Sequence, residues 1–271
     1  MEADLSRILA NGKLRPGSFW GKYVRENGQW LPLTIHCLDV AMVFQALCAL
    51  PSYRRALNLT SGIENISDAQ IDRLAVLAML HDAGKANLGF QAKVFNPELP
   101  QAGHIRELAP ILDPEVCDED LHMAFIRALP SELFEWFPDE ETAYSYFMAT
   151  FSHHGRPLMF RGDTLGTYRL AKSTWWRPSG EWDPMAAVAD IADASRQVFP
   201  KAFSTNVPPL PSTPRFHHRF AGILTLADWI GSHAAWFPVR EVSRAERVQH
   251  NRRVIPEVLK AIGLDISIPR R

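Results

Sequence analysis

The chain has 271 residues, of which 46% are hydrophobic and 22% charged, and its formal net charge is −1. A chain of this length can bury one large core or two small ones, and its charge balance is not that of a strongly basic nucleic-acid binder. A nucleic-acid role would therefore need a local basic patch or a partner that holds the strand.

The three cysteines, Cys37, Cys48 and Cys117, form no Cys-x-x-Cys pair, so neither a disulfide framework nor a thiolate zinc site is predicted. The first residues are acidic and lack the apolar segment of a signal peptide. The longest apolar stretch is shorter than the ~20 residues of a membrane span. We expect a soluble, cytoplasmic protein that does not enter a membrane.

Helical patterns follow one another along the chain. The first covers residues 33–50 and stops at Pro51. The second opens on a capping box, Ser67 to Gln70, and is expected to run to about Ala83, with Gly84 ending it. Further helices are predicted at residues 117–129, 139–154, 184–199 (opened by Asp183 and Pro184), 215–237 and 243–262, the last interrupted by Pro256. Since no convincing strand, repeat or flexible linker is visible, we expect a single all-α domain over residues 1–271.

Histidines and carboxylates sit at unusual places in these helices. His36 lies in an apolar helix, His81 and Asp82 follow the apolar run LAVLAML, and Asp228 is embedded in FAGILTLADWIGS. A buried carboxylate needs a partner, and no Arg or Lys lies three or four residues from Asp228. A divalent cation held by imidazoles would serve.

Each of these residues also has an ordinary explanation. A single core histidine can be a hydrogen-bonded structural residue, the pair His153-His154 can cap a helix, and Asp228 can accept an internal hydrogen bond. The ordered set is what favours a metal centre, with each ligand expected on its own helix.

The same order resembles that of the HD superfamily of metal-dependent phosphohydrolases. The segments FWGKY, LTIHCLDVA, LHDAGKANLGFQ, GHIRELAP, HHGRP and FAGILTLADWIGS are similar to motifs of one branch, the HD nuclease domain of the type I CRISPR-associated nuclease-helicase. The resemblance implies an HD-domain helical bundle with its metal site in a cleft between helices. It also implies two divalent transition-metal ions (Mn, Fe, Co, Ni or Zn) held by His36, His81, Asp82, His104, His153, His154 and Asp228. Asp82 would bridge the two, with His36, His81 and Asp228 on one metal and the remaining histidines on the other. His122 lies in the same interval as His104 and is the alternative ligand.

Imidazole-rich shells favour transition metals over magnesium, and a metal pair can activate water and stabilise an in-line phosphodiester displacement. Asp82 and Lys85 are the predicted catalytic residues, with Lys85 contacting the scissile phosphate or the developing charge. Ser232 could bond a ligand or phosphate, although small-residue packing explains it equally well.

Basic and aromatic residues alternate in the segment 161–178, where Arg169, Lys172, Trp175 and Trp176 are candidates for single-stranded DNA binding. The alternative is that the tryptophans close a loop onto the core.

The chain has no P-loop, so a helicase part is absent and the chain is either a stand-alone subunit or an excised domain. We expect an endonuclease or exonuclease that cleaves single-stranded DNA in type I CRISPR interference, with a helicase and the RNA-guided surveillance complex as partners. The alternatives are a phosphohydrolase of nucleotides or cyclic nucleotides and an inactive docking module.

Overall fold

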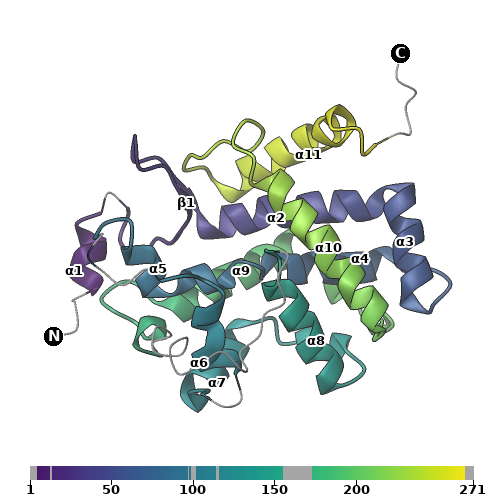
Figure 1. The fold of residues 1–271 in the computed structure, drawn as a ribbon, viewed down its shortest axis with the longest axis horizontal. Coiled ribbons are helices and arrows are strands. Elements are labelled where there is room, and N and C mark those ends of the chain that lie inside the picture. Colours follow the sequence, from purple (N-terminus) through teal and green to yellow (C-terminus); the bar gives the residue numbers. More distant parts are fainter. Residues whose placement is uncertain are drawn as a thin grey trace.

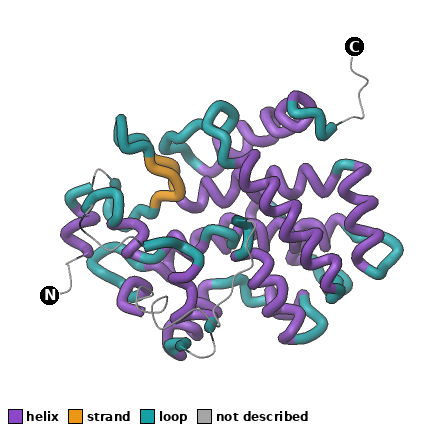
Figure 2. Tube along the Cα trace, in the orientation of Figure 1, coloured by secondary structure: helices purple, strands orange, loops and turns teal. Residues whose placement is uncertain are grey.

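The computed structural model describes residues 5–12, 14–96, 98, 102–113, 116–154 and 173–265. Helices and one two-stranded sheet make up this part of the chain (Figures 1 and 2), which confirms the predicted all-α class. The α-helices are α1 (Leu5–Ala10), α2 (Leu33–Ala49), α3 (Pro51–Ser61), α4 (Asp68–Met79), α5 (Leu88–Ala92), α6 (Ala109–Leu112), α7 (Glu119–Ala128), α8 (Glu140–Phe151), α9 (Pro184–Val198), α10 (Pro214–Gly231) and α11 (Arg244–Ala261). Short 3-10 helices are η1 (Ala83–Ala86), η2 (Arg106–Leu108), η3 (Leu133–Trp136), η4 (Ser173–Trp176) and η5 (Pro200–Phe203).

Helix α2 is the centre of the molecule. It packs against α4, α9, α10 and α11, and Figure 1 shows α10 crossing it. Its side chains are apolar on nearly every face and almost all are buried, as expected for a helix surrounded by others. His36 and Asp39 are therefore held inside the core.

A β-hairpin, which the sequence reading missed, covers one end of α2. Strands β1 (Trp20–Tyr23) and β2 (Trp30–Pro32) pair antiparallel, and Gly28 in their turn has φ +70°. Four and three residues, with a register irregularity, are too short to give a clear alternating pattern. The Asn27-Gly28 dipeptide was the available signal for the turn. Trp20 stacks on Phe90 of α5 with ring centroids 4.6 Å apart, which fixes the hairpin to the rest of the fold.

Helix α4 begins at its predicted capping box but ends at Met79, earlier than expected. The backbone then tightens: Ala83 N donates to Leu80 O (2.9 Å) and Lys85 N to Asp82 O (2.8 Å). Gly84 does not end the helix. A glycine is required at position 84 because a Cβ there would lie 1.6 Å from the carbonyl oxygen of His104.

Helix α11 continues through Pro256, so the predicted interruption is wrong. Pro256 and Arg252, four residues before it, are both exposed, and water can satisfy the carbonyl that a proline leaves free. The first predicted helix does stop before Pro51, since α2 ends at Ala49, but α3, which begins at Pro51, was not predicted. The expected start at Asp183 and Pro184, for α9, is confirmed.

Within the described residues, no single helix has the length and composition of a membrane span. Only α2 and α3 taken together, bent by 84° at their junction, reach it.

Candidate metal centre

The seven predicted ligands come from five places in the fold. His36 lies in the first turn of α2 and Asp228 in the last turn of α10. The others lie just beyond helix ends or in a loop: His81 and Asp82 after α4, His153 and His154 after α8, and His104 before η2. The expectation that each ligand lies on its own helix is therefore wrong for five of the seven. Turns after a helix allow consecutive side chains such as His81 and Asp82 to reach the same point, which a continuing helix does not.

Asp82 stands between two groups of imidazoles. Its Oδ2 lies 2.8 Å from His36 Nε2 and 3.3 Å from His81 Nε2. Its Oδ1 faces the other way, 3.2 Å from His104 Nε2 and 3.5 Å from His153 Nε2. The carboxylate is almost completely buried, so its two oxygens have the arrangement of a bridging ligand.

The remaining two residues complete these groups. Asp228 Oδ1 lies 3.8 Å from His81 Nε2 and 4.0 Å from His36 Nε2, and His154 Nε2 lies 2.9 Å from His104 Nε2. Ligand atoms converge to within 4.8 Å in three sets: His36, His81 and Asp228; His81, Asp82 and His153; and His104, His153 and His154. The structure thus brings all seven predicted residues together. His122 is elsewhere, on α7, bonded to the carbonyl of Ile111 (2.8 Å).

The backbone orients two of the imidazoles. Nδ1 of His81 lies 2.8 Å from the carbonyl of Ala78, and Nδ1 of His153 lies 3.2 Å from the carbonyl of Thr150. In each case a ring N–H that donates to the end of the preceding helix leaves Nε2 with a free lone pair, as in metal-ligating histidines.

The donor set fits bound cations. His81 Nε2 and Asp82 Oδ1 are buried and make no hydrogen bond, and leaving such atoms unsatisfied costs roughly 1–3 kcal/mol each. Burial lowers the pKa of His36 and His104 to about 3 and that of His153 to about 4, which keeps their ligand nitrogens unprotonated at neutral pH. Burial opposes ionisation of Asp82, but the Lys85 ammonium and the neighbouring imidazoles lower its pKa well below the usual range.

His81 is different from the other histidines. Burial alone would lower its pKa, but the carboxylates of Asp82 and Asp228 raise it above the ordinary value. Its proton and a cation compete for the same nitrogen, so metal affinity here depends on pH.

Lys85 and Ser232, predicted from their places in the sequence close to Asp82 and Asp228, both adjoin the candidate ligands. Lys85 Nζ lies 2.6 Å from Asp82 Oδ2 and donates to the carbonyl of Gly21 (3.1 Å). Ser232 Oγ donates to Asp228 Oδ1 (3.0 Å). Sequence reasoning assigned no role to Lys22, which also reaches this region through the carbonyl of Ser232. The FWGKY segment was the available signal.

Trp175 and Trp176 do not present stacking surfaces. They are 5% and 0% exposed. The Trp176 indole donates to the carbonyl of Glu107 (2.6 Å), and Trp175 packs over Gly89 so closely that a Cβ there would lie 2.6 Å from its ring. Both tryptophans therefore agree with the alternative prediction, in which they close a loop onto the core. Arg169 and Lys172 lie outside the described residues.

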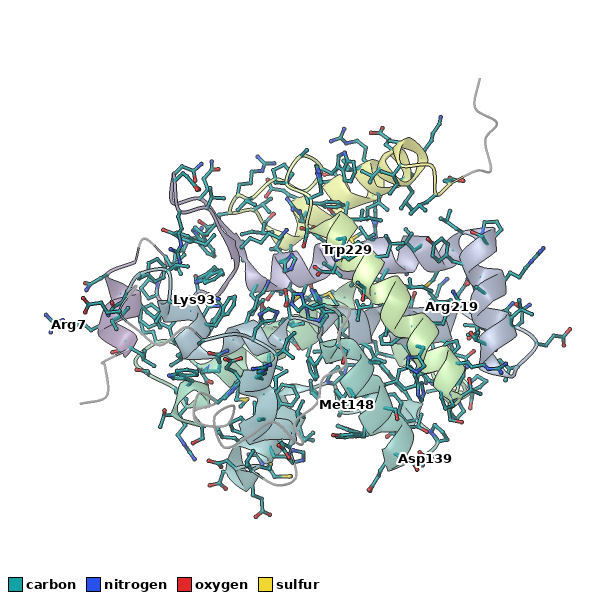
Figure 3. All side chains as sticks on the ribbon, in the orientation of Figure 1. Arg7, Lys93, Asp139, Met148, Arg219 and Trp229 are labelled. Atoms are coloured by element: carbon teal, nitrogen blue, oxygen red, sulfur yellow. The ribbon has the colours of Figure 1, made fainter. Side chains whose placement is uncertain are left out.

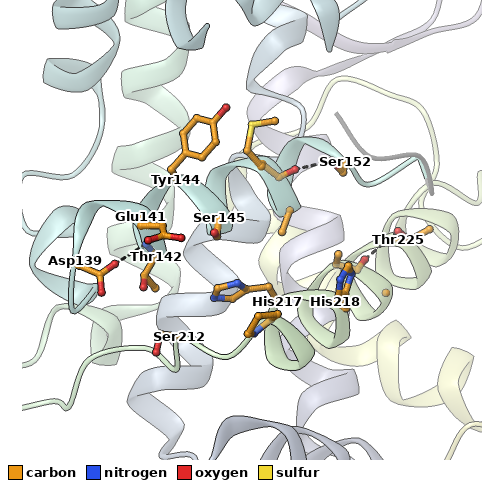
Figure 4. Close-up of a pocket in the computed structure, with 15 residues that line it drawn as sticks. Asp139, Glu141, Thr142, Tyr144, Ser145, Ser152, Ser212, His217, His218 and Thr225 are labelled. Atoms are coloured by element: carbon orange, nitrogen blue, oxygen red, sulfur yellow. Dashed lines mark hydrogen bonds between the residues drawn. The ribbon is translucent and has the colours of Figure 1, made fainter. Parts of the chain in front are cut away.

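A groove of about 710 Å³ runs between α8 and α10 (Figure 4). It adjoins the metal ligands at one end only, where Ser152 precedes His153 and Thr225 lies one turn before Asp228, and none of the seven ligands lines it. At its other end are Asp139, which caps the start of α8 and is also labelled in Figure 3, and Glu141. These carboxylates would repel a phosphate backbone, so the groove is not a favourable path for DNA.

Residues 20–237 match a family model described as Cas3, HD domain, whereas no curated protein matches the chain. A structure of Thermus thermophilus Cas3 HD domain in the presence of Ni²⁺ is 20% identical, with a TM-score of 0.54, over 96% of this chain and 91% of that one. T. fusca Cas3 with ATP is 21% identical, with a TM-score of 0.59, over 94% of this chain. A chain of a CRISPR RNA-guided surveillance complex, pre-nicking, is 20% identical, with a TM-score of 0.56, over 91% of this chain and 29% of that one. These similarities establish the HD-domain fold. The chain spans only 28% of the length of the T. fusca protein.

Proposed function

Because the chain belongs to the Cas3 HD-domain family, we propose that it is a metal-dependent nuclease that hydrolyses phosphodiester bonds of single-stranded DNA in type I CRISPR interference. The observation that carries this proposal is the arrangement of imidazoles on both oxygens of the buried Asp82 carboxylate. A carboxylate between two imidazole groups is suited to two divalent cations.

We propose that His36, His81, Asp82 and Asp228 hold one metal, and that Asp82, His104, His153 and His154 hold the other. A bound pair would supply Lewis acidity and an activated water to a phosphodiester. The chain's own contribution is to fix six of the seven ligands at or next to helix ends, to hold His104 in a loop, and to place Lys85 beside Asp82, where its ammonium can contact the phosphate under attack.

The cellular setting is part of the same proposal. The similarity to Cas3 chains more than three times as long, and to a chain of a surveillance complex, supports a helicase and an RNA-guided complex as partners. We place the activity in the cytoplasm, in keeping with the free cysteines.

The decisive experiment incubates the purified protein with labelled single-stranded DNA, double-stranded DNA, nucleoside triphosphates and cyclic nucleotides, each with Mn²⁺, Co²⁺ or Ni²⁺. We expect cleavage of single-stranded DNA. Asp82→Asn should lower that cleavage by about a hundredfold to a thousandfold, as loss of a major electrostatic group does, because an amide cannot bridge two cations.

Asp120→Asn is the matched control, since Asp120 is exposed on α7 and should retain full activity. Turnover of nucleotides with DNA untouched would replace the nuclease assignment with a nucleotide phosphohydrolase. Absence of turnover with any metal would favour a docking module.

A further inference from the structure

Lys22 is a half-buried cation without a carboxylate partner among the residues that the structure describes. It lies in β1, and its ammonium donates to the main-chain carbonyl of Ser232 at the end of α10. No described Asp or Glu oxygen lies within 4.0 Å of Lys22 Nζ, in contrast to Lys85, which lies 2.6 Å from Asp82. A partly desolvated ammonium that lacks a counter-ion is costly, so an anionic ligand would stabilise it.

The position of β1 brings Lys22 to the metal ligands. Gly21 touches α2 so closely that a Cβ there would lie 2.7 Å from His36 Cβ, and its carbonyl accepts from Lys85 Nζ at 3.1 Å. On the other side, Ser232, the partner of Lys22, donates to Asp228 Oδ1 at 3.0 Å. Lys85 therefore contacts the group formed by His36, Asp82 and Asp228 directly, and Lys22 is joined to it through Ser232.

The side-chain charges of Lys22, Lys85, Asp82 and Asp228 cancel one another, and two bound divalent cations would make this region positive. Burial and the nearby Lys85 ammonium lower the pKa of Lys22 to about 8. Asp82 and Asp228 are the carboxylates of the ligand set, and two divalent cations would exceed their charge before either lysine is counted. A polyanion is the ligand that such a site attracts.

We propose that Lys22 binds a second phosphate of the DNA strand, next to the phosphate that is cleaved. This inference rests on the proposed function and extends it to the chemistry that holds the substrate: of two successive phosphates in one strand, one would lie at the metal centre and the other at the Lys22 ammonium. Lys22 then anchors the strand, whereas Lys85 contacts the reacting group.

The test compares Lys22→Met and Lys22→Arg with Lys201→Met. Lys201 is an exposed lysine of η5 that lies 3.8 Å from Asp68. Asp68 begins α4, whose 12 residues span roughly 18 Å, and His81 follows the opposite end of that helix. We expect Lys22→Met to lower kcat/KM for single-stranded DNA roughly tenfold through KM, the loss typical of a hydrogen bond to a charged group. Lys22→Arg should retain most activity and Lys201→Met all of it.

Two further readouts separate substrate binding from a purely structural tie to α10. The slope of log kcat/KM against log salt should become shallower by about 0.7 in Lys22→Met, as expected when one phosphate contact to a single strand is lost. A series of single strands can be prepared in which one phosphate at a time is replaced by an uncharged methylphosphonate. At one position, this replacement should lower kcat/KM for the wild-type protein but not for Lys22→Met. Metal content and thermal midpoint should stay unchanged.

An unaltered salt slope, or a loss of metal that accounts for the loss of activity, would overturn the role of Lys22. Failure of the wild-type protein to cleave single-stranded DNA would instead overturn the proposed function, so the two failures are distinguishable.

Discussion

Asn87 links two loops that carry proposed metal ligands. Its amide Nδ2 donates to the carbonyls of Gly84 (2.7 Å) and Gly103 (3.0 Å), while its Oδ1 accepts from Phe90 N (2.8 Å) and caps α5. The two loops also touch directly: Gly84 has no room for a Cβ beside the carbonyl of His104. One side chain thus holds the His104 loop against the turn that carries His81 and Asp82.

Asn87→Ser should loosen only one half of the metal centre. Serine still caps α5 through its hydroxyl, but it cannot reach the two carbonyls, so His104 loses its support while His36 and His81 keep theirs. We expect metal content to fall from about two ions per chain toward one, measured by plasma mass spectrometry after dialysis. An Asn87→Ser protein that retains both metals, or loses both together, would contradict this role.

At the scale of elements, α2 aligns the ligands by contacts on two of its faces. Gly231 of α10 approaches so closely that a Cβ there would lie 3.0 Å from Val40 Cα, which places Asp228 beside His36. One turn beyond His36, Asp39 accepts from Arg247 Nε (2.7 Å) and Nη2 (2.6 Å) of α11. This buried ion pair joins the C-terminal helix to the helix that carries the first ligand.

Replacing only one partner of this ion pair should lower the free energy of unfolding far more than replacing both partners. Arg247→Met leaves the Asp39 carboxylate buried without a cation and should lower the free energy of unfolding by about 3–5 kcal/mol. The double variant Asp39→Asn with Arg247→Met removes both charges and keeps an oxygen for Asn251, which donates to Asp39 Oδ1 at 2.8 Å. We expect the double variant to be the more stable of the two in urea unfolding. Strictly additive losses from the two substitutions would show that the pair is not coupled.

At the scale of the whole molecule, the parts that the sequence predicts are those with a local signal. Capping residues such as Ser67 and Asp183 place helix starts, and the ordered histidines and aspartates identify the residues that the structure brings together around Asp82. The partners of Asp39 and Lys22 cannot be read from local patterns, because Arg247 and Ser232 lie 208 and 210 residues away. For Trp175 and Trp176, a local pattern suggested a function that the structure does not support. Their composition suggested a DNA surface, but aromatic residues also fill cores, and only packing distinguishes a surface role from a core role.

Metal removal should weaken the whole fold, because the ligands join α2, α10 and the ends of α4 and α8 around one buried carboxylate. A ligand present at about a thousand times its dissociation constant stabilises the folded state by ~4 kcal/mol. In a chain of this size, that corresponds to a fall in Tm of roughly 8–16 °C when the ion is withdrawn. Calorimetry with and without a chelator measures this fall in Tm.

Asp82→Asn is the control that isolates the cause: without its bridging carboxylate, the protein should melt at nearly the same temperature with and without chelator. An equal chelator effect on the wild-type and Asp82→Asn proteins would mean that the ions bind somewhere other than around Asp82.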